Sequence, residues 1–244
     1  NNYNTRNDDS RVGFFTTQTN HMTSIDQVNY RDFINRWRLE KKYPKKVFSE
    51  PITPIIWWIE NTTPYEFRDI IKEGVESWNI AFKEAGFINA IQVKIQPDTA
   101  TWDAGDIRYN VLRWTSSPRP PWGGYGPSFV NPRTGEILGA DIMLEWAYLT
   151  NRIVINELYN ESNSNLTHTH AECFAAYQSQ IENGFGLNYI KTMNLSEQLE
   201  EDLIKQSLYR LALHEVGHTL GLNHNFKGSL LLSNDELNDK EIVN

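Results

Sequence analysis

The first half of the chain carries the apolar patterns that β-strands require. The earliest is PIIWWIEN (54–61), a short continuous apolar run typical of a strand buried on both faces. Apolar and polar positions alternate in IQVKIQ (91–96) and DIRYNVLRWT (106–115), as in half-buried strands. A further strand is predicted at ILGADIML (137–144). We expect GYGPSFV (124–130) to be an exposed edge strand, because edges tolerate Gly and Pro.

The first helical pattern is YEFRDIIKEGVESWNIAFKEAGF (65–87), in which apolar residues recur at helical spacing. We expect Thr62 or Thr63 to cap its N-terminus, with Pro64 in the first turn. Gly86 is suited to end this helix.

A second, longer helical pattern runs from Asn194 to Leu220. Asn194 and Glu197 have the spacing of a capping box, and Gly221 follows the last helical residue. Residues 151–193 are predicted to be helix and loop, and the polar residues 1–30 a loosely held lead-in.

The order of these elements predicts one α/β or α+β domain, with a mixed sheet packed on helices. The expected division is an N-terminal lead-in segment (1–50) that packs on the main domain, a main subdomain (51–222) and the start of a C-terminal subdomain (223–244). The long helix falls at about 195–220.

Composition excludes several classes of protein. The net charge is −8, which gives no electrostatic reason to expect nucleic acid or an anionic membrane as a partner. No apolar run approaches the ~18 residues of a membrane-spanning helix. Cys173 is the only cysteine, so the chain forms no internal disulfide and no zinc site built from several thiolates.

The most informative segment is HEVGHTLGLNH (214–224). On a helix, His214 and His218 lie four residues apart on one face, where two imidazoles can bind one Zn²⁺. Glu215 projects beside that metal, where it can act as a general base on water without being a ligand.

His224 cannot reach the same metal from a straight helix, so the backbone must turn back. Gly221 is the residue type for this hinge, because it adopts the left-handed conformation at little cost. Three protein ligands leave the fourth position of zinc open, as in catalytic sites. Five fixed residues at this spacing arise by chance on the order of once in 10⁵ such chains. The alternatives are unrelated histidines on a polar helix and a zinc site without catalysis.

With this motif, the sequence resembles the metzincin clan, whose pattern HExxHxxGxxH it matches at every defined position. Further segments resemble a branch of bacterial zinc-dependent metalloproteases. They are DSRVGFFTT, FINRWRLEKK, RYNVLRWT, GPSFVNPRTGEILGADI and HEVGHTLGLNHNF, and they span residues 9–226.

The resemblance implies a metzincin-like catalytic domain with a twisted, five-stranded type of mixed sheet, an antiparallel edge strand above the cleft and a long active-site helix. It also implies one catalytic Zn²⁺, a protein or peptide substrate that pairs with the edge strand, and a secreted, periplasmic or cell-surface location. Neither nucleic acid nor a transmembrane segment is expected, and the oligomeric state stays open.

One feature of the clan is a methionine turn downstream of the third histidine. The methionines here are Met22, Met143 and Met193, all upstream, and twenty residues follow His224. Either the turn lies beyond Asn244 or the protein lacks it. Because twenty residues are too few for a subdomain, we expect the first.

Other residues with metal-binding or reactive side chains are weaker candidates. We expect surface or structural roles for His21, His168, His170, Cys173, Asp141 and Glu145. The leading hypothesis is therefore a zinc metalloendopeptidase with Glu215 as general base. The alternatives are a non-catalytic binding module on the same scaffold and a zinc hydrolase of non-peptide amides, such as cell-wall crosslinks.

Overall fold

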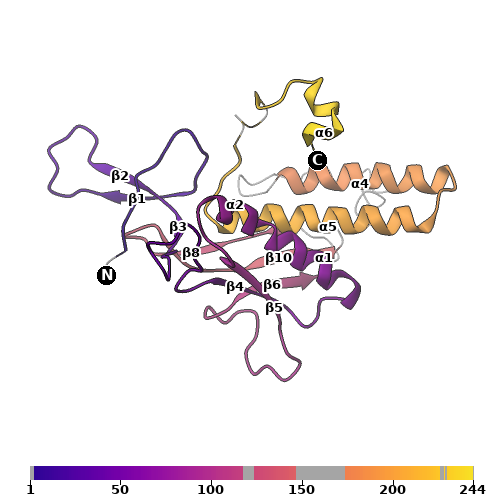
Figure 1. Cartoon of the computed structure of the whole chain (residues 1–244), viewed down its shortest axis with the longest axis horizontal. Helices are drawn as coiled ribbons and strands as arrows, with labels where there is room; N and C mark the ends of the chain where they lie inside the picture. Colours follow the sequence, from indigo (N-terminus) through magenta and orange to yellow (C-terminus); the bar gives the residue numbers. More distant parts are fainter. Residues whose placement is uncertain (1–2, 118–123, 147–173, 226–227, 229, 244) are drawn as a thin grey trace, which may run out of the picture.

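The computed structural model describes residues 3–117, 124–146, 174–225, 228 and 230–243, and its centre is a five-stranded sheet (Figure 1). In spatial order, the strands are β5 (Ile91–Ile95), β4 (Ile55–Ile59), β6 (Asn110–Thr115), β10 (Ile142–Glu145) and β7 (Gly124–Tyr125). Neighbouring strands are parallel, except that β7 runs antiparallel to β10 at the edge. This arrangement confirms the predicted mixed sheet with an antiparallel edge strand.

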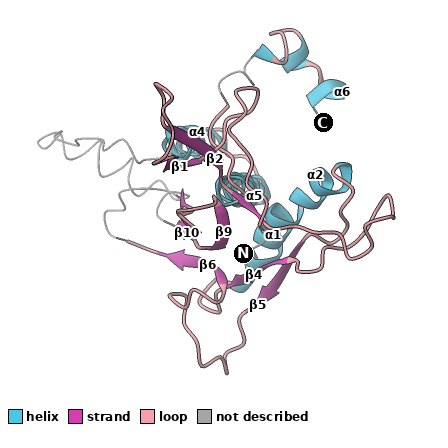
Figure 2. Ribbon diagram, turned by 90° about the vertical axis from the view of Figure 1, so that its left-hand side faces the viewer, coloured by secondary structure: helices cyan, strands magenta, loops and turns pink. Residues whose placement is uncertain are grey.

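Helices cover one face of this sheet. They are α1 (Tyr65–Glu76), α2 (Trp78–Glu84), α4 (Phe174–Thr192) and α5 (Glu197–Thr219). Helices α1 and α5 pack on the sheet, and α4 packs against α5 farther from it; Figure 2 shows α4 and α5 end-on. Within the described residues, no helix combines the length and the apolar character needed to cross a lipid bilayer.

The core lies between the sheet and helices α1 and α5. From β4, Trp57 and Ile59 are fully buried, as the continuous apolar run of that strand predicts. The helices contribute Val75 from α1 and Ala212 and Val216 from α5, all of them with no exposed surface. Burial of Ala212 and Val216 along one side of α5 stabilises the fold and fixes which way the rest of the helix faces.

Smaller sheets flank this core. They are a three-stranded sheet of β3 (Arg36–Trp37), β9 (Glu136–Ala140) and β8 (Ser128–Val130), and a hairpin of β1 (Thr16–Asn20) and β2 (Tyr30–Ile34). The chain ends with η3 (Glu236–Asn238) and α6 (Lys240–Val243). The hairpin corrects the expectation that residues 1–30 are only loosely held.

The predicted helix over 65–87 is divided into α1 and α2 at Ser77. The Ser77 hydroxyl donates to the carbonyl of Glu73 at 2.7 Å and also contacts the Tyr209 hydroxyl at 2.7 Å. A serine that bonds back to its own helix in this way bends it. Gly86 ends α2 in the left-handed region, as predicted. Pro64, rather than a threonine, occupies the N-cap position.

The predicted strand over 137–144 is also two strands, divided at Asp141 between the small and the central sheet. The Asp141 carboxylate accepts a hydrogen bond from the backbone N–H of Val111, and the backbone N–H of Asp141 donates to the carbonyl of Pro127. These bonds replace ladder pairing at the point where the chain changes sheets. The edge segment over 124–130 is divided in the same way into β7 and β8.

The capping box predicted at Asn194 and Glu197 is wrong. Ser196 is the N-cap of α5, and it makes no side-chain capping bond. Asn194 instead adopts a left-handed conformation with φ of 51°, in the tight turn between α4 and α5. Asparagine tolerates this conformation better than most residues, which explains its place in the turn.

Candidate metal centre

Helix α5 presents two histidines on the face opposite its buried stripe. Leu208, Ala212 and Val216 recur every four residues and have no exposed surface, and the last two belong to the core that the sheet forms. The rotation fixed by this stripe leaves His214 and His218 half-buried on another face, one turn apart. Their ring centroids are 4.6 Å apart.

A glycine turn brings the third histidine back to this pair. Gly221 has φ of +97°, in the left-handed region. The N–H of Gly221 donates to the carbonyl of His218 at 2.9 Å, and the N–H of Leu222 donates to that of Gly217 at 3.1 Å. These two bonds form a Schellman motif, which ends the helix and reverses the chain. His224 therefore lies beside the two helical histidines. In a continuous helix, it would lie ten residues from His214 along the axis of α5.

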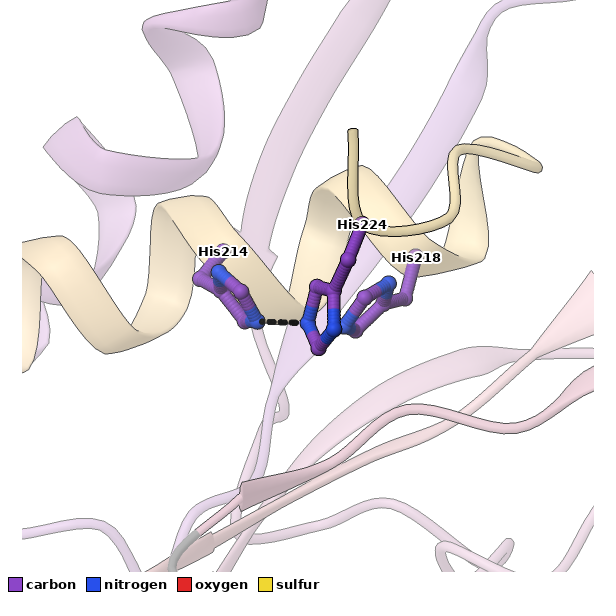
Figure 3. Close-up of side chains that lie close together, drawn as sticks. All are labelled: His214, His218 and His224. Carbon is purple, nitrogen blue, oxygen red and sulfur yellow. Dashed lines mark hydrogen bonds between the residues drawn. The ribbon is translucent and has the colours of Figure 1, made fainter. Parts of the chain in front are cut away.

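The three imidazoles converge, as Figure 3 shows. One ring nitrogen of each of His214, His218 and His224 lies within 4.8 Å of the others. Nε2 of His214 and Nε2 of His224 are 3.3 Å apart. Two ligands of a tetrahedral zinc, each ~2.0–2.1 Å from the ion, are about 3.3 Å apart, so the donor set fits this metal.

Hydrogen bonding and burial favour the neutral form of the His214 and His218 rings. Nδ1 of His218 lies 2.9 Å from the carbonyl oxygen of Leu222, so a proton on Nδ1 is donated there and Nε2 keeps its lone pair for a metal. Burial lowers the pKa of His214 to about 4, and the neighbouring His218, His224 and Arg210 act in the same direction. Burial also lowers the pKa of His218 below its ordinary value. Neutral imidazole is the form that binds metals.

Glu215 follows the first histidine of the cluster in the sequence and is 1% exposed. Its Oε1 is buried and has no hydrogen-bond partner in the described part of the chain. Burial raises the pKa of this carboxyl group to about 7. A buried carboxylate oxygen without a donor is costly, which indicates that a ligand or water completes its surroundings.

The edge strand β7 forms the wall against Glu215. A β-carbon at Gly124 would lie 2.5 Å from Oε1 and 2.8 Å from Cδ of Glu215. A β-carbon at Gly126 would lie 3.0 Å from the backbone oxygen of Glu215. Only glycine at position 124 leaves room for the carboxyl group, and this need for close approach was not recognised in the sequence.

A pocket of about 380 Å³ adjoins the histidines. Trp78 and Leu213 give it an apolar wall, and Arg210 adds a cation at its rim. The Trp78 indole donates to the carbonyl of Leu213 at 2.9 Å, which fixes α2 against α5. The pocket is large enough for a side chain of a bound molecule.

The weaker candidates lie away from this cluster or outside the described residues. His168, His170 and Cys173 fall outside them. His21 is exposed in the β1–β2 loop. Glu145 is buried rather than solvated, and its carboxylate accepts bonds from the hydroxyls of Thr115 and Ser117 and from the Ser117 N–H. Asp141 and Glu145 thus support local structure, as expected. In the described ranges, the histidine triad is the one group of three or more metal-binding side chains.

The fold and the triad define a metzincin-like protein, and comparison with known proteins supports this class. The family described as Met-zincin matches residues 196–244, which include α5 and all three histidines. The family described as "Domain of unknown function (DUF5117)" matches residues 1–42. No curated protein and no solved structure matches the chain. The Met-zincin match and the triad together indicate a zinc-dependent metallopeptidase.

Proposed function

We propose that the protein is a zinc metalloendopeptidase in which His214, His218 and His224 hold one Zn²⁺ and Glu215 is the general base. The observation that carries this proposal is the convergence of three imidazoles, together with the neighbouring buried Glu215, whose Oε1 has no donor among the described residues. A zinc ion held there would acidify water and polarise the carbonyl group of a peptide bond.

Glu215 performs the proton transfers. Its carboxylate takes a proton from the water whose oxygen forms a bond to the carbonyl carbon, and it passes this proton to the amine nitrogen as the C–N bond breaks. A pKa near 7 in the metal-free protein suits a group that both accepts and donates a proton at neutral pH. A bound cation nearby would lower that pKa and favour the carboxylate.

The substrate is proposed to be an extended peptide that pairs with the edge strand β7. Strand addition uses backbone hydrogen bonds, so it positions a peptide without demanding a particular sequence. Because β7 lies against Glu215, a peptide paired with it would present its backbone to the carboxyl group. Secretion or attachment to a cell surface, and the division of the chain at residues 50 and 222, stay predictions.

The test is metal analysis of the purified chain, followed by digestion of a peptide library with and without a chelator. Cleavage that the chelator abolishes and added zinc restores supports the proposal. One bound zinc without cleavage of either peptides or cell-wall material would overturn it in favour of a binding module. Cleavage of cell-wall material but not of peptides would overturn it in favour of an amide hydrolase.

A further inference from the structure

The N-terminal segment pairs with the turn that carries the third histidine. The N–H of Phe15 donates to the carbonyl of Gly221 at 2.8 Å, and the N–H of Asn223 donates to the carbonyl of Gly13 at 2.9 Å. Phe14 and Leu222 thereby form an isolated antiparallel bridge. Residues 13–15, hereafter the clasp, thus bind the backbone on both sides of Leu222.

The clasp is itself held in place by Asn35, the residue between β2 and β3. The N–H of Asn35 donates to the carbonyl of Phe15 at 2.8 Å, and the Asn35 side chain accepts the Thr17 hydroxyl at 2.7 Å. A β-carbon at Gly13 would lie 3.0 Å from the carbonyl oxygen of His224. The clasp therefore approaches the backbone of the third histidine closely and is not free to move independently of the hairpin.

The side chain of the clasp also reaches the histidine cluster. The ring of Phe15 meets the imidazole of His218 edge-on, with 5.6 Å between the ring centroids. Edge-to-face contacts of this kind favour one ring orientation. Nδ1 of the same imidazole lies 2.9 Å from the Leu222 carbonyl oxygen, which belongs to the turn that the clasp binds. One segment thus restrains both the His218 ring and the His224 turn.

We propose that the clasp is part of the metal centre, with Phe15 as a positioning residue that sets zinc affinity through His218 and the His224 turn. The inference rests on the zinc site of the proposed function. It joins the two segments that separate families match, residues 1–42 and 196–244, into one functional unit. The physical reason is that His224 follows a turn, so its position depends on what holds that turn.

Groups that orient metal ligands typically contribute about 10- to 100-fold to metal affinity. Two variants of the complete chain separate the contributions of the clasp. Phe15→Pro removes the N–H that bonds to Gly221 and keeps the carbonyl that bonds to Asn35. Phe15→Ala keeps both backbone bonds and removes the ring that contacts His218. Phe15→Tyr keeps an aromatic ring and should restore the affinity.

The controls lie in the same hairpin but far from the turn. Tyr30→Ala removes an aromatic side chain that is 41% exposed, close to the 38% of Phe15. Ser24→Pro removes a backbone N–H that donates to His21 in the β1–β2 loop. Zinc affinity is measured by chelator competition, and the absorption spectrum of the Co²⁺ form reports the ligand geometry.

We expect both Phe15→Pro and Phe15→Ala to weaken zinc binding by about 10-fold or more and to change the Co²⁺ spectrum, while the controls match the unsubstituted chain. The inference would be overturned if Phe15→Ala, and Phe15→Pro where it folds, had the zinc affinity and the Co²⁺ spectrum of the unsubstituted chain. If Phe15→Pro does not fold, as judged by circular dichroism, Phe15→Ala and Phe15→Tyr decide. A parent chain that binds no zinc would instead overturn the proposed function, so the two failures are distinct.

Discussion

The backbone of Gly124 lies against the carboxyl group of Glu215, so closely that a β-carbon at Gly124 would come within 2.9 Å of three atoms of that side chain. Real β-carbons essentially never approach other atoms this closely, so any side chain at position 124 must displace the carboxyl group. The edge strand and the proposed general base are therefore in tight contact.

We predict that Gly124→Ala lowers peptide hydrolysis by at least about 10-fold while zinc content is kept, because a small displacement of a catalytic group is costly. The measurement is kcat/KM with a peptide substrate, together with metal analysis. Gly139→Ala is the matched control, because its added β-carbon would meet its neighbours at 3.4 Å or more. Equal activity of the two variants would refute the contact's role.

Replacement of the proposed base tests the chemistry directly. Glu215→Gln keeps the shape of the side chain but cannot take up a proton, so we expect a loss of about 10²- to 10⁴-fold in kcat with zinc retained. Glu201→Gln is the control, because Glu201 lies on the same helix and is exposed in a pair with Lys205. Wild-type turnover in Glu215→Gln would exclude the proposed role.

The same substitution should change the pH dependence of stability in the metal-free protein. Burial raises the pKa of Glu215 from 4.5 to about 7, so the folded state binds the proton more tightly than the unfolded state. Its contribution to stability is complete below pH 4.5 and is lost as the pH rises to about 7. Glu215→Gln should therefore gain up to about 3 kcal/mol relative to the parent chain between these pH values.

Urea unfolding in the presence of a chelator, at pH 4.5, 6 and 8, measures this difference. The histidines act in the opposite direction, because the lowered pKa values of His214 and His218 remove stability as the pH falls below 6.5. They are present in both proteins, so their effect cancels in the comparison. A stability difference that does not vary with pH would contradict the assignment of a buried, uncompensated carboxyl group.

The hinge should tolerate no side chain. Gly221 has φ of +97°, and an added β-carbon would overlap the carbonyl oxygen of Asn35. We expect Gly221→Ala to lose at least about 1–3 kcal/mol of folding free energy from backbone strain and to bind zinc more weakly. Denaturant unfolding and chelator competition check this. Gly105→Ala is the control, since its added β-carbon would meet only the flexible Asp103 side chain.

The sequence predicted most of the central sheet and the metal motif, because these depend on local patterns. The apolar run that forms β4, the alternation in β5 and β6, and the spacing of the histidines each specify an outcome within about a dozen residues. Two of the errors lie where contacts with distant residues decide. Ser77 divides a helix through contacts with Glu73 and Tyr209, and Asp141 divides a strand by binding Val111 and Pro127.

By itself, the sequence determined the chemistry: which side chains can hold a zinc ion, which carboxyl group stands beside them, and where a glycine allows the chain to turn. The tertiary structure alone decided what surrounds these groups. The approach of Gly124 to Glu215 and the pairing of Phe15 with Gly221 join residues 91 and 206 positions apart. Spacing along a helix is fixed by its period, whereas such contacts depend on how separate elements pack, and no local pattern encodes that.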